Sequence, residues 1–185
     1  PLLATRPFAG TGITPASKIA VATKSPQTGR IGDSLSSSYL ALALKRTGFD
    51  ALVVSGAAPA WSCLIVDDGR VELRPADHLL GLDPEQTADV LRAERGSAFR
   101  VAAIGVAGEN GVRYAAISND GRLAGRTGAG AVMGSKRLKA IAVRGSRLPA
   151  VADPRGLAAA ARELAERSHG PVTAKYRELG TAANV

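Results

Sequence analysis

The sequence predicts an α+β fold: two β-sheets built from a duplicated strand–loop–helix–strand unit with a pseudo-twofold relation, followed by the start of a helical domain at the C-terminus. Three observations support this prediction. Short apolar runs bounded by turn residues recur up to about residue 145. Residues 44–56 (LKRTGFDALVVSG) align without gaps with residues 133–145 (MGSKRLKAIAVRG). Residues 151–185 instead carry the composition and capping signals of helices.

The elements of the first half follow from turn and cap signals. Residues 1–5 read as a strand already under way, so we expect a piece of a longer protein. A strand at 18–23 ends in the turn cluster 25–29. A buried helix is predicted over Ser36–Arg46, ended by Gly48, and a strand over 51–56.

The middle of the chain predicts a hairpin and a helix. Asp67-Asp68-Gly69 joins two apolar runs, 62–66 and 70–74, as a tight turn would. Asp83 can cap the next helix, with Pro84 in its first turn and Gln86 completing a capping box, and Gly96 ends it.

The second half repeats the pattern of the first. We expect strands at 101–104 and 112–117 around a loop at 105–111, then a Gly- and Arg-rich stretch, a short helix at 130–139 and a strand at 140–145. Upstream of the aligned segments, TGRI at 28–31 matches DGRL at 120–123 after a three-residue slip. Two facing copies of one unit explain this similarity, and coincidence between two ordinary turn–strand segments is the alternative.

The domain organisation predicted from these signals has two parts. Residues 1–150 form the sheet domain, and residues 151–185 begin a helical domain whose first helix is capped by Asp153 and starts at Pro154.

Composition restricts the function classes. Lys plus Arg number 24 against 16 Asp plus Glu, a net charge of +8 that favours anionic partners. Aromatic residues make up only 4%, which argues against a base-stacking nucleic-acid module. The single cysteine, Cys63, excludes an iron–sulfur or cysteine-based zinc site built by this chain alone and favours a reducing compartment, so we expect the cytoplasm. No apolar run approaches the roughly 18 residues of a membrane span, so no membrane partner is expected.

The strongest candidate site is the stretch from Asp120 to Lys136. Its glycines allow a ligand to approach the backbone, and the helix that follows directs its N-terminus toward the same space. Arg122 and Arg126 add forked donors that match phosphate or carboxylate oxygens. The alternative is a glycine-rich turn with solvated arginines. The corresponding stretch 29–38 offers hydroxyl groups, or a plain serine helix cap.

Other polar residues give weaker signals. His78 and His169 lack a second ligand at metal spacing. Glu109 with Asn110 more simply holds a turn than acts in acid–base chemistry. Lys18 and Lys24 can reach the cleft or lie in solvent. No Ser-His-Asp, Cys-His or H-E-x-x-H pattern is present.

Four strings resemble, in order, the N-terminal domain of the tungsten-containing aldehyde ferredoxin oxidoreductases: VATKSPQTGRIGDS, LKRTGFDALVVSG, IGVAGENGVRYAAISND and AGRTGAGAVMGSKRLKAIAVRG. The resemblance covers about residues 1–150. It implies a base domain of two β-sheets related by a pseudo-twofold, carrying two pterins that hold one tungsten or molybdenum, with magnesium bridging the pterin phosphates. The positions that match its cofactor contacts are Arg122, Leu123, Gly125 and Arg126, with Lys18 and Ser37 in the first half.

The sequence departs from the family pattern at several positions. Lys18 stands where arginine is usual, 35–38 reads Leu-Ser-Ser-Ser in place of Asn-Ser-Gly-Gly, Val106 replaces proline and Leu80 replaces tryptophan. Lys18 keeps a charge but loses the forked geometry, and Leu35 cannot hydrogen-bond, so the contacts of the first loop are in question.

The resemblance implies an enzyme that oxidises an aldehyde to a carboxylic acid and passes electrons through a 4Fe-4S cluster to ferredoxin. It places the cluster cysteines and the catalytic residues outside these 185 positions, so the chain alone is expected to be inactive, and it allows a homo-oligomer. The competing hypothesis is a non-catalytic basic module that binds phosphate or nucleic acid.

Overall fold

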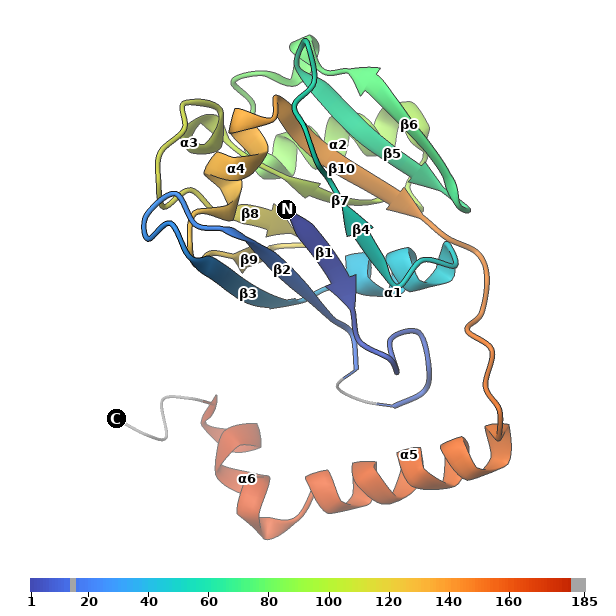
Figure 1. Cartoon of the computed structure of the whole chain (residues 1–185). Helices are drawn as coiled ribbons and strands as arrows, with labels where there is room; N and C mark the ends of the chain where they lie inside the picture. Colours follow the sequence, from blue (N-terminus) through green and yellow to red (C-terminus); the bar gives the residue numbers. More distant parts are fainter. Residues whose placement is uncertain (14–15, 181–185) are drawn as a thin grey trace.

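The computed structural model describes residues 1–13 and 16–180, which form two β-sheets packed face to face with helices between and around them (Figure 1). The first sheet has the order β3-β2-β1-β4, with all neighbours antiparallel: β1 Leu2–Thr5, β2 Lys18–Lys24, β3 Ile31–Ser37 and β4 Ala51–Val53. The second has the order β6-β5-β10-β7-β8-β9, parallel only between β10 and β5: β5 Ser62–Asp67, β6 Arg70–Pro75, β7 Arg100–Ala103, β8 Ile117–Asn119, β9 Arg122–Ala124 and β10 Leu138–Arg144. The helices are α1 Tyr39–Arg46, η1 Asp77–Leu79, α2 Pro84–Arg95, α3 Val106–Glu109, α4 Ala129–Ser135, α5 Pro154–Ser168 and α6 Pro171–Glu178.

The strand order confirms the predicted repeat. The series β1, β2, β3, α1, β4 corresponds to β7, β8, β9, α4, β10, and the order β3-β2-β1-β4 recurs as β9-β8-β7-β10. The register agrees, since Leu3 lies opposite Leu52 as Ala102 lies opposite Ile141. Chance similarity would not reproduce an entire sheet order, so the two halves are copies of one unit. The second sheet adds β5 and β6.

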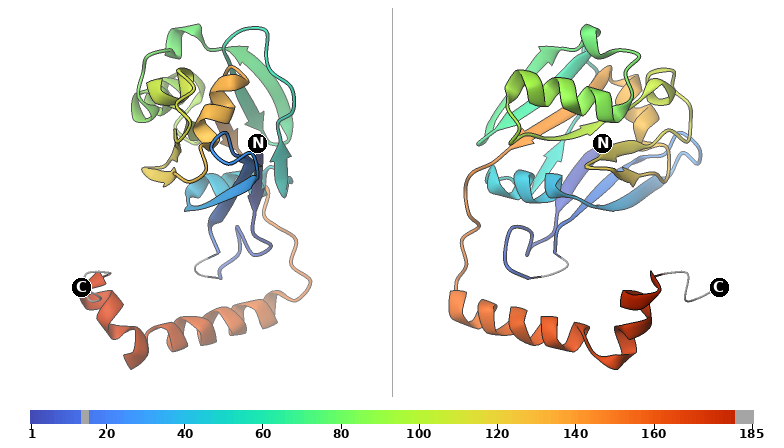
Figure 2. Two further views of the ribbon diagram at one scale, coloured as in Figure 1. Left: turned by 60° about the vertical axis from the view of Figure 1, so that its left-hand side comes forward. Right: turned by 180° about the vertical axis from the view of Figure 1, so that it is seen from behind.

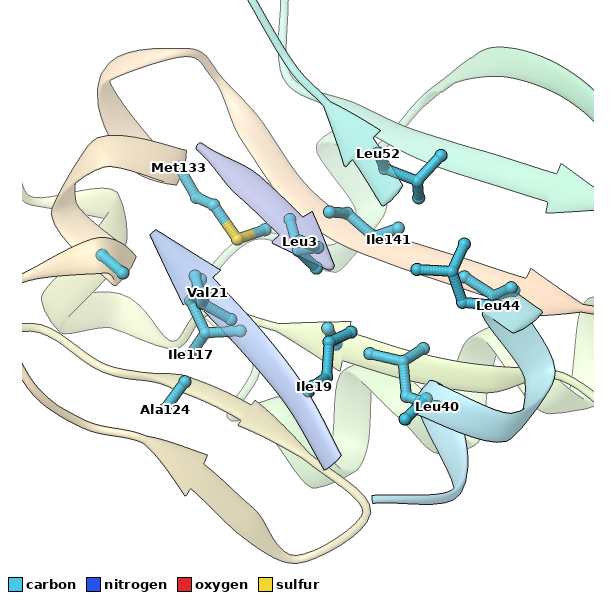
Figure 3. Close-up of a cluster of buried hydrophobic side chains, with 14 of the residues drawn as sticks. Leu3, Ile19, Val21, Leu40, Leu44, Leu52, Ile117, Ala124, Met133 and Ile141 are labelled. Carbon is cyan, nitrogen blue, oxygen red and sulfur yellow. The ribbon is translucent and has the colours of Figure 1, made fainter. Parts of the chain in front are cut away.

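One apolar core joins the two copies (Figure 3). Both sheets and the helices α1 and α4 contribute fully buried side chains to it, among them Leu3, Ile19, Val21, Leu40, Leu44, Ile117, Met133 and Ile141. The copies interlock: α1 of the first packs on β7 and β10 of the second, while α4 of the second packs on β2 of the first. Each copy therefore covers the apolar face of the other.

A second core lies behind the second sheet, under α2 (Figure 2, right). It contains the buried side chains of Cys63, Ile65, Leu79, Leu91 and Phe99. The predicted cap of this helix is confirmed. The amides of Glu85 and Gln86 each donate to Asp83 Oδ1 at 2.8 Å, and the amide of Asp83 donates to Gln86 Oε1 at 3.1 Å.

Four predicted elements are corrected by the structure. The helix expected over 130–139 ends at Ser135, because Leu138 and Lys139 already belong to β10. The helix expected over Ser36–Arg46 begins at Tyr39, because residues 36 and 37 continue β3 and the Ser38 hydroxyl accepts the Leu40 amide as the helix cap. The strand expected over 112–117 is present only at Ile117, and the loop at 105–111 contains α3. The Gly- and Arg-rich stretch holds the hairpin β8–β9, which its glycines obscured in the sequence.

The helices α5 and α6 lie apart from the sheets (Figure 2, left) and bury none of their residues. Asp153 caps α5 by accepting the Gly156 amide at 2.9 Å, and proline occupies the first turn of both helices, as predicted. The division into domains at residue 150 stays a prediction.

The helices α3 and α4 meet through glycines. A side chain at Gly134 would clash with the carbonyl oxygen of Gly108, and one at Gly130 would clash with the backbone of Ala115 and Ala116. The backbones therefore approach more closely than any other residue type allows.

We expect Gly134→Ala to destabilise the fold by at least about 2 kcal/mol, because backbone atoms cannot give way as a side chain can. Urea unfolding measures this. Gly125→Ala is the matched control: its added methyl would meet only Leu123 Cβ, at 3.8 Å, and stability should change by less than about 0.5 kcal/mol. Equal effects of the two substitutions would contradict this account of the helix contact.

A fully buried lysine, Lys139, ties α3 to β10. Its Nζ donates to the carbonyl oxygens of Leu82 and Ile104, both at 2.8 Å, and to Glu109 Oε1 at 2.5 Å. Glu109 also accepts the amide of Gly81 at 3.1 Å. Glu109 was expected to hold the turn of its own loop, and the structure instead pairs it with a buried lysine and with the amide of another loop.

Removing one partner of this pair should cost more than removing both. Glu109→Ala leaves a buried ammonium without its counter-charge, and we expect a loss of about 3–5 kcal/mol. The double variant Lys139→Met/Glu109→Ala buries no unpaired charge and should be more stable than Glu109→Ala in the same urea titration. A double variant as unstable as the sum of the two single losses would show that the pair acts through packing alone.

Candidate functional site

The edge strands β3 and β9, one from each copy, lie side by side and run in opposite directions (Figure 1). At one end, a side chain at Gly32 would clash with Thr127. Toward the other end, the Ser36 hydroxyl donates to Asn119 Oδ1 at 3.2 Å. We call the surface formed by the exposed residues within 30–37 and 122–127 the platform.

Arg122 follows the tight turn between β8 and β9. Asp120 and Gly121 have φ angles of 48° and 69°, the left-handed values that a two-residue hairpin needs, and asparagine, aspartate and glycine adopt them most readily. The turn places Arg122 opposite Asn119, the residue bonded to Ser36.

Asp120 connects this turn to the first copy through hydrogen bonds. Its Oδ2 accepts the Ser38 hydroxyl at 2.8 Å and the Leu40 amide at 3.0 Å, and its Oδ1 lies 3.7 Å from Arg92 Nη2. A carboxylate at the N-terminus of α1 is favoured by the unpaired amides and the helix dipole. The turn that carries Arg122 is therefore held by a helix from the opposite copy.

The loop between β9 and α4 is held by its own backbone. Thr127 and Gly128 have φ angles of 68° and 74°, and a side chain at Gly128 would clash with the carbonyl oxygen of Arg113. Gly125 differs, because it has neither a left-handed φ nor a close neighbour. Nothing within the described chain requires glycine at position 125. Because Gly125 is exposed and has no side chain, a ligand can approach its backbone.

Four of the six predicted site residues lie together in this segment. Arg122, Leu123, Gly125 and Arg126 are all exposed, Leu123 to 63%. Within residues 1–13 and 16–180, the guanidinium groups of Arg122 and Arg126 make no hydrogen bond or ion pair. Forked cationic donors on a fixed backbone are suited to anionic oxygens.

The two first-half candidates, Lys18 and Ser37, form a cross-strand pair at one end of β2 and β3. Ser37 is exposed between Ser36 and Ser38, whose hydroxyls bond to Asn119 and Asp120, so it lies on the Arg122 side of the platform. Lys18 is half-buried. The serine-cap alternative is confirmed for Ser38 alone, while Ser36 links the two copies.

The sequence did not reveal the contacts that join the copies: Ser36 to Asn119, Ser38 to Asp120, and Gly32 against Thr127. The aligned repeat was the available signal, because it predicted that both loops converge. It carried no information on which hydroxyl would find which partner.

The remaining candidates have structural roles. His78 Nε2 lies 3.1 Å from Glu94, and His169 Nδ1 lies 2.7 Å from the Ala165 carbonyl oxygen. Cys63 is buried, and burial raises the pKa of its thiol to about 12. No group of three His, Cys, Asp or Glu side chains that could hold a metal ion is found in the described part of the chain. Among the same residues, no helix is long and apolar enough to cross a membrane.

Residues 2–145 match the family model described as the aldehyde ferredoxin oxidoreductase N-terminal domain. The chain belongs to the aldehyde ferredoxin oxidoreductase family. This match covers both copies of the repeat and the whole platform, so the resemblance read from the four strings is confirmed.

Curated relatives agree with this assignment. The tungsten-containing aldehyde ferredoxin oxidoreductase of Pyrococcus furiosus is 46% identical over 154 residues, 82% of this chain and 26% of the relative. The protein of the same name from Thermococcus kodakarensis is 47% identical over 149 residues, 80% of this chain and 25% of the relative. The WOR-like subunit of an aliphatic sulfonate oxidoreductase from Pyrococcus furiosus is 34% identical over 188 residues, 94% of this chain and 30% of the relative.

A solved structure shares the fold. The active-site complex BamBC of benzoyl coenzyme A reductase, bound to 1,5-dienoyl-CoA, superposes with a TM-score of 0.87 at 37% identity, covering 89% of this chain and 25% of that one. The chain thus spans about a quarter of the length of the proteins that it matches.

The bond from Asp120 to α1 gives a stability prediction. Asp120→Asn keeps the left-handed turn but replaces a charged acceptor by a neutral one, and Ser38→Ala removes the hydroxyl that it binds. We expect each to cost about 1 kcal/mol. The double variant should lose less than the sum, because both act on one network. Strict additivity in urea unfolding would show that the two residues are not coupled.

Proposed function

We propose that this chain is the cofactor-holding domain of a tungsten, or alternatively molybdenum, pterin oxidoreductase. The enzyme would oxidise an aldehyde with water to a carboxylic acid, releasing two protons and two electrons, and the electrons would pass through a 4Fe-4S cluster to ferredoxin. The observation that supports this most strongly is the platform. It holds two exposed arginines whose guanidinium groups have no partner among the described residues, on a fixed glycine-rich backbone within the segment that the family model matches.

The residues of the platform fit such a cofactor. Arg122 and Arg126 would bind its anionic groups, and the open backbone at Leu123 and Gly125 would let a flat ring system approach. Ser37 and Lys18 would add a hydroxyl and a charge from the first copy. When bound, the metal and its pterins would supply the redox chemistry, and a magnesium ion would accompany them. This chain binds and orients the cofactor.

The relatives support a role in cofactor binding rather than substrate choice. Proteins named for aldehydes, for an aliphatic sulfonate and for benzoyl coenzyme A all match this one domain. What their names have in common is a match to this domain and not a substrate. We therefore place the residues that select and transform the substrate outside these 185 positions, together with the cysteines of the iron–sulfur cluster.

The same reasoning extends to the rest of the protein. We propose that α5 and α6 open a helical domain beyond residue 150, and that the enzyme works in the cytoplasm. The isolated chain should oxidise no aldehyde.

The platform predicts the effect of single substitutions on cofactor content. In the full-length protein, Arg126→Ala should remove a charge-assisted hydrogen bond of roughly 1.5–3 kcal/mol and release the cofactor, while thermal stability changes little. Gly125→Val should lower the tungsten content more than Arg126→Lys, because a branched side chain blocks the backbone whereas lysine keeps the charge. Tungsten per polypeptide, measured beside thermal unfolding, tests all three.

Two results would overturn the proposal. Full tungsten occupancy in both Arg126→Ala and Gly125→Val would mean that the cofactor lies elsewhere. Active full-length protein that contains no tungsten, molybdenum or iron would exclude the reaction class. The basic-module alternative instead predicts nucleic-acid binding that weakens steeply with salt.

A further inference from the structure

The two copies of the repeat differ at the side away from the platform. In the second copy, β5, β6 and α2 precede β7, and β5 pairs in parallel with β10 to extend the sheet (Figure 1). In the first copy β4 takes the place of β10, but within residues 1–13 and 16–180 no strand pairs with its outer edge. The first sheet therefore has four strands and the second has six.

The backbone of β4 can accept another strand at this outer edge. The Val54 amide donates to the Pro1 carbonyl oxygen, which lies on the side of β1. Successive amides of a strand alternate in direction, so the Val53 amide points away from β1. The repeat aligns Val53 with Ala142, and Ala142 is paired with Ile65 of β5. An open strand edge of this kind is a template for strand addition.

The outer face of the first sheet, which points away from the core shared by the two copies, is apolar and lacks the cover that the second sheet has. The outward-facing residues of β1 and β4 are all apolar and half-buried or exposed: Leu2, Ala4, Ala51 and Val53. Their counterparts on β7 and β10 are all buried in the core under α2: Val101, Ala103, Ala140 and Ala142. Val53 is 75% exposed. The same positions are thus apolar in both copies, but a helix covers them only in the second.

The inner face of the β5–β6 hairpin is also uncovered. Leu64 and Val66 contact the core shared by the two copies, and their cross-strand partners Leu73 and Val71 lie on the same face. Leu73 and Val71 are 59% and 53% exposed. Together with β4 they line an apolar groove of about 380 Å³. Contiguous exposed apolar surface of this kind marks a contact with another segment.

We propose that the groove and the outer face of the first sheet bind a β-hairpin followed by an amphipathic helix, the first-copy counterparts of β5, β6 and α2. The order of elements identifies the occupant. Because β5, β6 and α2 directly precede β7, their counterparts would directly precede β1, in the part of the full-length protein before Leu2. Their length would be close to that of residues 62–99.

The occupant would restore the same strand order to both sheets. Its first strand would pair in parallel with β4, as β5 pairs with β10, and its hairpin would face β5 and β6 across the groove. Its helix would cover Val53 as α2 covers Ala142. The relatives are long enough to supply such a segment, since this chain spans about a quarter of their length. This inference does not depend on the proposed function.

The first measurement is the alkylation rate of single introduced thiols in the full-length protein, resolved by peptide mass spectrometry. Val53→Cys lies under the expected helix and Val71→Cys under the expected hairpin. Arg70→Cys is the matched control, because Arg70 is exposed and lies next to Val71 on β6 with its side chain on the opposite face. We expect Val53→Cys and Val71→Cys to react at least about tenfold more slowly than Arg70→Cys, since a packed segment must open first.

The second measurement identifies the occupant. Photo-leucine, a diazirine analogue of nearly the same size as leucine, is incorporated into the unsubstituted full-length protein, where it also replaces Leu73 in the groove. We expect cross-links from Leu73 to a peptide that precedes Leu2 in the same polypeptide. Because no cysteine variant is involved, this result holds even if one of those variants unfolds.

Three results would overturn the proposal. Equal alkylation rates at the three positions in folded protein would show that the face is open. Protection that is lost on dilution, with cross-links between two polypeptides, would assign the face to a second copy of the protein. Cross-links from Leu73 only to peptides beyond residue 185, or to none outside residues 1–185, would exclude the preceding segment as the occupant.

Discussion

The two copies of the repeat share a single apolar core, and the position of every candidate site residue follows from how they meet across it. Leu3 and Val21 from the first sheet and Ile117 and Ile141 from the second are buried together, with α1 and α4 inserted from opposite copies. This packing brings the edge strands β3 and β9 next to each other. The platform is thus a product of the interface between the copies and belongs to neither alone.

Polar contacts at that interface fix the position of β3 relative to β9. The Asp120 carboxylate meets Ser38 and the Leu40 amide at the start of α1, so one side chain both caps a helix of one copy and holds the turn of the other. Glycines at positions 108, 130 and 134 let α3 and α4 pack backbone to backbone behind the loop of Arg126. Both arginines of the second copy therefore project from backbone that is held on two sides.

Much of this architecture could be predicted from the sequence, because local signals were strong where the chain is regular. The capping box at Asp83, the proline starts of α5 and α6, and the aligned segments 44–56 and 133–145 all specify their structure locally. The strand character of Ser36 and Ser37 could not be predicted, since it depends on pairing with Ile19 and Lys18. The short strand β9 was hidden for the same reason, because its three residues lie between Gly121 and Gly125 and its structure depends on pairing with β8.

The residues of the candidate site also differ in whether the sequence could predict them. Arg122 and Arg126 were identifiable because forked cations in a glycine-rich loop suit anionic ligands whatever the surrounding fold. The partners of Ser36 and Ser38 were not, since they lie 83 and 82 residues away in the sequence and only the packing of the two copies brings them together.

The interlocked helices also govern how the chain acquires its structure. Because α1 packs on β7 and β10 as well as on β1 and β2, the first half cannot bury the apolar face of its helix completely until the last strand of the second sheet is available. Most stabilising contacts join residues far apart in sequence, and closing such long loops before any contact is gained slows folding. During synthesis, the first four strands would leave the ribosome with their apolar faces uncovered. Folding would then proceed in one cooperative step once β10 has emerged.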